Sequence, residues 1–374
     1  MRITILLISL IIFTVATAQK KPYLLVGTYT SGKSEGIYVY SFDTKNATTS
    51  LVSTAKIKNP SYLAVSTDKK TVYSVAETAD TTGNIIGGGV TAFAFDAADG
   101  KLTAMNTQPS GGTNPCYVSV TKSGKWVFAG NYSSGTLSVF PVTTNGNIDA
   151  AIQTIAHSGS GPNKDRQEGP HVHSTVLSPD NNYLFVPNLG IDKVMIYKLN
   201  QQTGKLTPAP VPFVKTAPGS GPRHFEFAPN KRYAYLIEEL SGNVVAYAYN
   251  NGSLKQIQSI SSIPKNFTGS IGCADIHVSP DGNFLYSSNR GDGNSITIFS
   301  INQQTGKLTV AGYQSTLGKT PRNFNLDPSG NFLLAANQQS DDIVIFKINK
   351  KTGLLTDTGK RIKVPNPVCL KWIF

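Results

Sequence analysis

The fold is decided by a stretch that ends one apolar strand in a tight turn, Val278-Ser279-Pro280-Asp281-Gly282, and then enters an alternating strand, Phe284-Leu285-Tyr286-Ser287-Ser288. Proline fixes φ, and Asp and Gly tolerate a tight reversal, so the first part predicts a turn. A further alternating strand follows at residues 295–299, and a hairpin signal at residues 302–308 closes the unit. The pattern predicts a unit of four short antiparallel strands.

This unit recurs along the chain. The last apolar residue of the first strand in successive copies is Val65, Val120, Leu177, Phe227, Val278, Leu326 and Trp372. These positions are 46 to 57 residues apart, close to the period of roughly 40–50 residues that is typical of propeller blades. The sequence therefore predicts seven blades of four-stranded antiparallel sheet arranged around an axis.

The two ends of the chain predict how the ring closes. Residues 23–29 have the pattern of a second strand with no first strand before them, whereas the matching first strand, residues 367–372, is the last in the chain. Sharing one blade between the termini removes two open sheet edges. We therefore expect residues 19–374 to form one all-β domain, a seven-bladed β-propeller whose C-terminal strand joins the N-terminal blade.

The first 18 residues have a different character. Arg2 precedes an apolar run at residues 3–15, and small residues follow at 16–18, as in a secretory signal peptide. The run is short for a membrane span. We expect residues 1–18 to be a cleaved signal, with export to a periplasm or beyond and no stable membrane anchoring afterwards. A retained N-terminal anchor is the alternative.

Charge and cysteine content restrict the possible partners and cofactors. The net charge of +12 favours anionic partners, but the lysines are scattered through turns without a run of five or six like charges, so we do not expect nucleic-acid binding. Cys116, Cys273 and Cys369 allow at most one disulfide and fit small buried positions. No Cys–His spacing indicates zinc, and we expect no metal or other cofactor.

Candidate functional residues occur where the first strands begin, near one mouth of the predicted channel. Four residues before the last apolar position, most copies are small or apolar, but three carry His173, Arg223 and Arg322. The next position carries His224 and Asp275, with His171 and His277 nearby. The titratable side chains at these strand starts are His171, His173, Arg223, His224, Asp275, His277 and Arg322. Packing does not require them there.

A second group of candidates follows the second strands. Eleven residues after the last apolar position of the first strand, several copies have Asn, for example Asn131, while one copy has Glu238. Asparagine at such a position often forms hydrogen bonds to turns and to the backbone. The next position in successive copies is Tyr29, Glu77, Tyr132, Leu189, Glu239, Arg290 and Gln338. Glu239 and Arg290 occupy equivalent places in adjacent blades. A structural ion pair between them is the alternative to a functional role.

Together these positions predict a basic site with one or more proton-transfer groups at one mouth. Arginine forks match carboxylate or phosphate oxygens, and a carboxylate beside a histidine can move protons near neutral pH. No Gly-X-Ser-X-Gly elbow is present, which disfavours a covalent serine mechanism. Water is the simpler nucleophile.

At these residues the chain resembles a known family, the seven-bladed β-propeller lactonases, which include bacterial 6-phosphogluconolactonases and fungal 3-carboxy-cis,cis-muconate lactonizing enzymes. The resemblance covers essentially all of the mature chain. The segments that carry it include residues 26–30, 169–174, 221–224, 238–240, 274–282, 288–291 and 321–324. It implies hydrolysis of a small anionic sugar-acid lactone, with His173 and Glu239 in the active site and Arg223 and Arg290 binding the anion.

Two features depart from the family pattern. The family's Asn-Glu pair reads Glu238-Glu239 here, which predicts a second carboxylate in the site. His171 stands two residues before His173, on the same face of a strand, so His171, His173 and Glu239 all stay open as the base. The residues expected to bind substrate are His171, His224, Arg322, Glu238, Asp275, His277, Tyr29 and Asn131.

Two other functions are compatible with this pattern. A muconate-type cycloisomerase would use the same acid and base without water. A non-catalytic exported propeller would bind a ligand or protein at the channel mouth, because the fold does not determine the function. The predicted signal fits an unphosphorylated or carboxylated lactone as well as 6-phosphogluconolactone.

Overall fold

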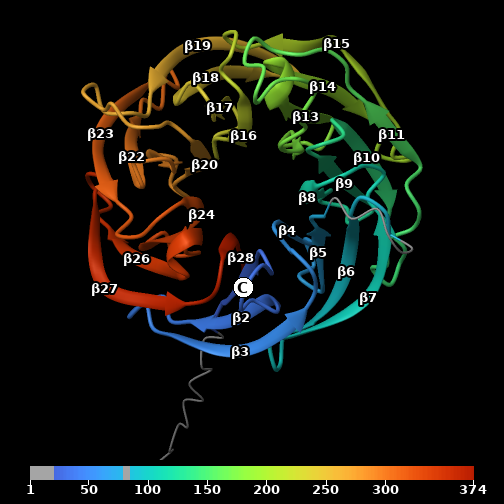
Figure 1. Ribbon diagram of the computed structural model, residues 1–374, viewed down its shortest axis with the longest axis horizontal. Helices are drawn as coiled ribbons and strands as arrows, with labels where there is room; N and C mark the ends of the chain where they lie inside the picture. Colours follow the sequence, from blue (N-terminus) through green and yellow to red (C-terminus); the bar gives the residue numbers. More distant parts are fainter. Residues whose placement is uncertain (1–20, 79–84) are drawn as a thin grey trace, which may run out of the picture.

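The computed structural model describes residues 21–78 and 85–374, and these residues form seven four-stranded antiparallel sheets arranged around a central axis (Figure 1). The predicted seven-bladed propeller is confirmed. The predicted signal peptide lies outside the described residues. Among the described residues, no helix combines the length and the apolar character that crossing a membrane requires.

Each blade runs from an innermost strand to a strand at the rim (Figure 1). In the order of blades 1 to 7, the innermost strands are β28 (Pro367–Ile373), β4 (Leu63–Val65), β8 (Pro115–Val120), β12 (Val176–Leu177), β16 (Pro222–Phe227), β20 (Cys273–Val278) and β24 (Pro321–Leu326). The second strands are β1 (Tyr23–Thr28), β5 (Thr71–Ala76), β9 (Trp126–Asn131), β13 (Tyr183–Asn188), β17 (Tyr233–Glu238), β21 (Phe284–Asn289) and β25 (Phe332–Asn337).

The outer half of each blade is built in the same way. The third strands are β2 (Gly36–Phe42), β6 (Gly89–Asp96), β10 (Thr136–Pro141), β14 (Lys193–Leu199), β18 (Asn243–Asn250), β22 (Ser295–Ile301) and β26 (Asp342–Ile348). The rim strands are β3 (Thr49–Lys56), β7 (Lys101–Pro109), β11 (Gln153–Ala156), β15 (Leu206–Lys215), β19 (Ser253–Ser261), β23 (Leu308–Ser315) and β27 (Leu355–Lys363). Two short 3-10 turns, Leu189–Ile191 and Gln338–Ser340, follow β13 and β25.

The hydrophobic core lies between neighbouring blades. Second strands such as β9 and β25 are buried along their whole length, because both faces of each blade pack against a neighbour. Rim strands such as β23 alternate between exposed and covered residues, as expected for a strand with one face in solvent. The blades therefore form a closed ring around the axis, with each blade packed against its neighbours.

The C-terminal strand closes the ring as predicted. β28 pairs antiparallel with β1, with Leu24 opposite Trp372 and Val26 opposite Leu370. The Trp372 ring packs edge-on against Phe42, with ring centroids 5.0 Å apart. One blade is thus built from both ends of the chain.

Blade 4 departs from the repeat. Its innermost strand was expected to begin near Val172, but β12 covers only Val176–Leu177, and Val172 forms an isolated bridge with Asn188. The reason is local hydrogen bonding: the His171 amide donates to the Asn188 side chain at 2.8 Å, and the Ser174 hydroxyl donates to the Arg223 carbonyl of blade 5 at 2.8 Å. The segment therefore bonds partly to its neighbour.

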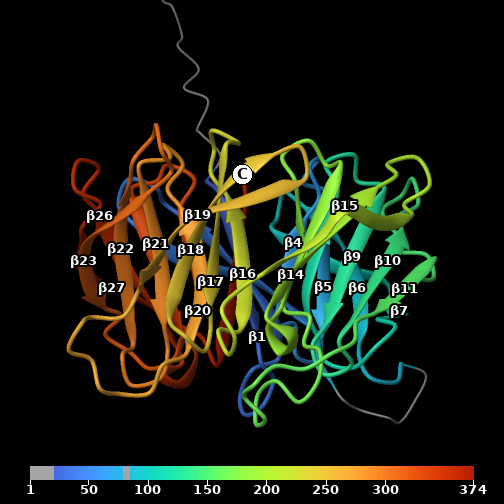
Figure 2. The same ribbon diagram turned by 90° about the horizontal axis from the view of Figure 1, so that it is seen from above.

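The antiparallel topology brings both groups of candidate residues to one face. First strands begin, and second strands end, at the face drawn at the bottom of Figure 2. The turns from first to second strands lie at the other face, with the C-terminus (top of Figure 2). This arrangement places the start of β16 next to the end of β17.

Candidate active site

The carboxylate of Glu239 lies at the centre of a cluster of charged side chains. Glu239 follows β17 and is buried. Arg166 Nη2 lies 2.6 Å from its Oε1 atom, and Arg223 Nε and Arg290 Nη2 lie 2.8 and 3.0 Å from its Oε2 atom. The structure thus brings Glu239, Arg223 and Arg290 together as predicted, and it adds Arg166.

The arginines keep Glu239 ionised. Burial by itself raises the pKa of a carboxyl group, but Arg290, Arg223 and Arg166 outweigh it and hold the pKa of Glu239 well below its usual value. Burial, together with the neighbouring guanidinium groups, lowers the pKa of Arg223 to about 10. One carboxylate among three guanidinium groups leaves a net positive charge, which favours an anionic ligand.

His173 lies beside this cluster in its neutral form. Its Nε2 atom is 3.9 Å from Glu239 Oε2, and its Nδ1 atom is 3.9 Å from the Cys116 sulfur. Burial and then the charge of Arg223 hold the pKa of His173 well below its usual value. A neutral imidazole can accept a proton at neutral pH, so His173 has the protonation state that a general base needs.

A second polar group surrounds Arg322. Its guanidinium lies over the Tyr29 ring, 5.4 Å from the centroid, and Tyr29 donates its hydroxyl to Glu77 at 2.9 Å. Burial alone would lower the pKa of Arg322, but Tyr29, Glu77 and Glu239 outweigh it and raise that pKa, so Arg322 lies at the same mouth as both carboxylates. Within residues 21–78 and 85–374, no hydrogen bond or ion pair engages its guanidinium. Of the four arginines at this mouth, Arg322 is therefore the one not already paired with a carboxylate in the described structure.

His224, Asp275 and His277 form a hydrogen-bonded chain beside Arg223. His224 Nδ1 lies 2.7 Å from Asp275 Oδ1, and His277 Nε2 lies 3.1 Å from Asp275 Oδ2. We expected all three to bind substrate. Their polar atoms instead bond one another and their neighbours, so the geometry does not support direct contact with a ligand.

His171 is occupied in a different way from His173. Its ring stacks on Tyr132 with centroids 4.3 Å apart, its Nδ1 atom lies 3.0 Å from the Tyr132 carbonyl, and its Nε2 atom lies 3.2 Å from Glu168. Both ring nitrogens therefore have partners. Of the two histidines that the sequence left open as the base, the geometry favours His173.

Two other predicted contacts are not at the cluster. Glu238 accepts a hydrogen bond from the Ser241 hydroxyl at 2.7 Å, because successive residues of an extended chain point in opposite directions. The expectation of a second carboxylate beside Glu239 is therefore wrong. Asn131 donates to the Ser110 carbonyl at 3.1 Å and to the Thr136 hydroxyl at 3.0 Å. These bonds are the structural role that Asn often has at this repeat position, in place of the expected contact with substrate.

Three residues at the site were not among the predicted ones. Glu77 and Tyr132 occupy the same repeat position as Tyr29, Glu239 and Arg290, so the signal that identifies them is that column. Arg166 lies in the loop between β11 and β12, outside any column. A repeat alignment carries no information about such a residue.

Cys116, Cys273 and Cys369 are free and buried, as expected, and burial raises the pKa of the Cys116 thiol, which stays protonated. Within the described part of the chain, no group of three or more His, Cys, Asp or Glu side chains is arranged to hold a metal ion.

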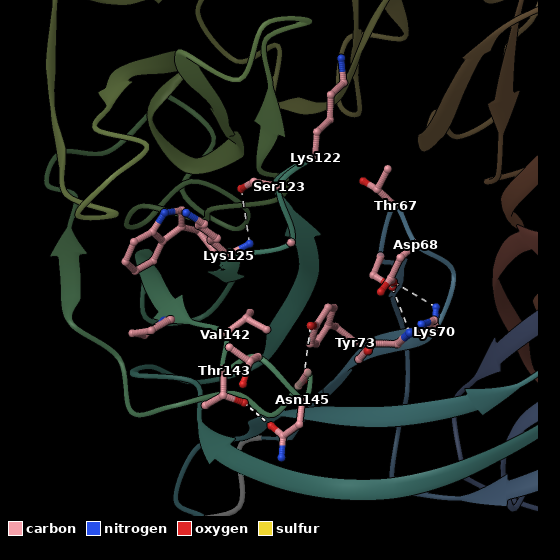
Figure 3. Close-up of a pocket in the computed structure, with 17 residues that line it drawn as sticks. Thr67, Asp68, Lys70, Tyr73, Lys122, Ser123, Lys125, Val142, Thr143 and Asn145 are labelled. Atoms are coloured by element: carbon pink, nitrogen blue, oxygen red, sulfur yellow. Dashed lines mark hydrogen bonds between the residues drawn. The ribbon is translucent and has the colours of Figure 1, made fainter.

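A cavity of about 840 Å³ lies elsewhere, between blades 2 and 3 (Figure 3). Its walls come from the turns between first and second strands, residues 66–71 and 122–126, and from residues 141–146. These turns are at the face opposite Glu239. The cavity contains none of the predicted site residues and is separate from the charged cluster.

The comparisons with known proteins agree with the fold and identify the family. A family model described as lactonase, seven-bladed β-propeller, matches residues 23–372. The chain belongs to this lactonase family. The chain is 42% identical to a 6-phosphogluconolactonase of Bacillus subtilis, in an alignment that covers 93% of this chain and 97% of the relative. It is also 42% identical to a 6-phosphogluconolactonase of Formosa agariphila, in an alignment that covers 91% of this chain and 96% of the relative.

A solved structure in this group is that of a periplasmic gluconolactonase from Pseudomonas aeruginosa. It is 37% identical in sequence to this chain and superposes with a TM-score of 0.89. The superposition covers 94% of this chain and 99% of the gluconolactonase. The resemblance stated from the sequence is thus confirmed. The chain is a lactonase, that is, a hydrolase of cyclic esters.

Proposed function

We propose that the cluster around Glu239 hydrolyses a sugar-acid lactone that carries an anionic group, with His173 as the general base. The observation that carries this proposal is the neutral, buried imidazole of His173, 3.9 Å from an ionised carboxylate that three arginines hold in place. Guanidinium groups lie 2.6 to 3.0 Å from both carboxylate oxygens of Glu239, which leaves the ring of His173 as the group that takes the proton.

The reaction needs one proton removed and one returned. His173 takes a proton from a water molecule, and the water oxygen bonds to the lactone carbonyl carbon. The negative charge of Glu239 stabilises the imidazolium that forms. As the bond between the carbonyl carbon and the ring oxygen breaks, His173 returns the proton to the ring oxygen, and the product is the open hydroxy acid. Arg290 and Arg166 stabilise the charge that grows on the carbonyl oxygen.

Arg322 binds the anionic substituent of the substrate in this proposal. Arg166, Arg223 and Arg290 already share Glu239, whereas the guanidinium of Arg322 lies over the Tyr29 ring and, among the residues that the structure describes, forms no hydrogen bond or ion pair. A guanidinium without a carboxylate partner matches a phosphate or carboxylate on the sugar. The site is therefore expected to prefer charged lactones to neutral ones.

The predicted signal peptide and the periplasmic relative support export of this lactonase, with a role in carbohydrate metabolism outside the cytoplasm. An exported enzyme meets unphosphorylated sugar-acid lactones more often than phosphorylated ones. A carboxylated sugar lactone is accordingly a candidate alongside 6-phosphogluconolactone.

The substrate proposal is tested by acid release in a pH-stat, with 6-phosphoglucono-lactone, a carboxylated sugar lactone and glucono-lactone, each corrected for spontaneous hydrolysis. We expect kcat/KM for the best anionic lactone to exceed that for glucono-lactone by about tenfold or more, since one charged hydrogen-bonding partner contributes roughly 1.5–3 kcal/mol. Arg322→Gln should remove this preference. Arg232→Gln, an exposed arginine at the opposite face, is the matched control.

A neutral lactone preferred by both wild type and Arg322→Gln would contradict the role of Arg322. No hydrolysis above the spontaneous rate would contradict the proposed function. Interconversion of a carboxymuconate and its lactone in that case would support the cycloisomerase instead.

A further inference from the structure

We propose that Asp275, His277 and Glu226 are positioning residues that fix the tautomer of His224 and through it hold Arg223 on Glu239. The proposal rests on the proposed function of the Glu239 cluster. It concerns a chain of side chains that lies next to that cluster and that the hydrolysis steps do not use.

The chain runs through three neighbouring innermost strands. Arg223, His224 and Glu226 belong to β16, Asp275 and His277 to β20, and Asn323 and Phe324 to β24. Arg223 is almost completely buried. A buried guanidinium needs fixed partners, because water does not solvate it.

The contact between Arg223 and His224 fixes a tautomer. Arg223 Nη1 lies 3.2 Å from His224 Nε2, and a guanidinium nitrogen can only donate. His224 Nε2 must therefore accept, which places the proton of the neutral ring on Nδ1. Asp275 Oδ1, 2.7 Å from Nδ1, is the acceptor that holds the proton there. Burial and Arg223 lower the pKa of His224 to about 4, so the ring is neutral.

The other oxygen of Asp275 is surrounded by donors. The Asn323 side-chain amide donates to Oδ2, the Phe324 amide lies 3.4 Å from it, and His277 Nε2 lies 3.1 Å from it. His277 Nδ1 in turn lies 2.6 Å from Glu226 Oε2. Burial alone would lower the pKa of His277, but Asp275 and Glu226 outweigh it and raise that pKa to about 10. His277 is therefore a charged donor to both carboxylates.

Proton transfer along this chain into the site is not what the geometry favours. The proton donated by Arg223 Nη1 occupies the lone pair of His224 Nε2, so the ring cannot pass a proton to His173 without breaking that contact. The rings of His173 and His224 meet edge to face at 5.3 Å, and their nitrogens make no hydrogen bond in the described structure. Positioning is the role that fits these contacts.

Asp275→Asn tests the proposal with a distinct atomic outcome. The three donors around Oδ2 require the amide oxygen of Asn there, so its NH₂ group must face His224 Nδ1. Nδ1 then has to accept, the ring proton moves to Nε2, and Nε2–H opposes the Arg223 donor. We expect the ¹⁵N signals of His224 to show the Nδ1–H tautomer in wild type and the Nε2–H tautomer in Asp275→Asn.

The same variant should lower kcat for the best lactone by roughly 10–100-fold, the usual effect of removing an orienting partner, with KM changed much less. Asp327→Asn replaces a buried aspartate at the other end of β24, where it caps a turn, and is the matched control for stability and activity. It should leave both the His224 tautomer and kcat unchanged.

Two results would overturn the proposal. One is an Nε2–H tautomer of His224 in the wild-type protein, a measurement that needs neither a folded variant nor a lactone. The other is an unchanged kcat in Glu226→Gln, a change at a partly exposed side chain that weakens the hold on His277. Because the tautomer is measured without substrate, its result is independent of whether the cluster hydrolyses lactones.

Discussion

Glu239 is the residue on which the ion pairs of the site converge. Glu239→Gln keeps the shape of the side chain but leaves buried Arg223 without its carboxylate, which should cost roughly 3–5 kcal/mol of stability. Lactone turnover should fall by roughly 10²–10³, the usual effect of removing one fixed electrostatic partner, because the imidazolium of His173 loses the charge that stabilises it. Urea unfolding and pH-stat rates measure the two effects. Turnover equal to that of wild type would remove Glu239 from the site.

The protonation state of His173 predicts the pH profile. A lowered pKa means that the ring stays neutral well below pH 6.5, so kcat/KM should be level from pH 7.5 through pH 6.5 and fall only at more acidic pH. Initial rates in overlapping buffers, corrected for spontaneous hydrolysis, give the profile. A half-loss of activity at pH 6.5 or above would show that the base is an ordinary, solvated histidine.

Repeat columns predicted residues well where the side chain belongs to the repeat. His173, Arg223, Glu239 and Arg290 meet because equivalent positions of successive blades lie around one axis. The prediction that Glu238 lies beside Glu239 was wrong, because the repeat position does not determine which way a side chain points at the end of a strand. The sequence did not separate the roles of His173 and His171, because their contacts are with residues of neighbouring blades, Glu239 and Tyr132. The pattern of a single repeat contains no information about those contacts.

The loop between β11 and β12 is the element that completes the site. It carries Arg166, whose side chain is 42% exposed although its guanidinium reaches Glu239. Because solvent screens this pair, Arg166→Ala should reduce the free energy of unfolding by less than about 1 kcal/mol. The kcat/KM for the anionic lactone should fall, since the carbonyl oxygen loses one of the charges that stabilise it during the reaction.

Steady-state kinetics and urea unfolding of Arg166→Ala check this prediction, with Arg232→Ala, at the opposite face, as the control. An unchanged kcat/KM would show that Arg166 only pairs with Glu239 and takes no part in the reaction. The repeat pattern predicted the strands and turns, but it predicted neither the position of Arg166 in the loop between β11 and β12 nor the short length of β12. Both depend on contacts between blades rather than on the local sequence pattern.

Closure of the ring belongs to the molecule as a whole. β28 pairs with β1, and its Leu370 backbone also bonds Asn323 and Asn325 of blade 7. Removal of residues 364–374 should therefore expose the sheet edge of β1, abolish cooperative thermal unfolding and cause aggregation. Removal of exposed Phe374 alone is the control. A truncated chain that melts cooperatively near the wild-type temperature would mean that the ring does not need its terminal strand.

The global architecture was the most predictable feature of the chain. The spacing of the repeats, together with the order of strands at residues 23–29 and 367–372, is sufficient to predict seven blades and their closure. The substrate was not predictable in the same way, because its binding depends on which arginines are paired with Glu239 and which stay available to an anionic ligand. That pairing is a property of the closed ring.

The measurement that bears most directly on the proposed hydrolysis is kcat/KM of His173→Gln on the best anionic lactone, beside His157→Gln. His157 is a partly buried histidine, bonded to Asn188 and Tyr197 away from Glu239. We predict a fall of roughly 10²–10⁴ for His173→Gln and a rate within about twofold of wild type for His157→Gln. Equal rates for the two variants would contradict His173 as the base.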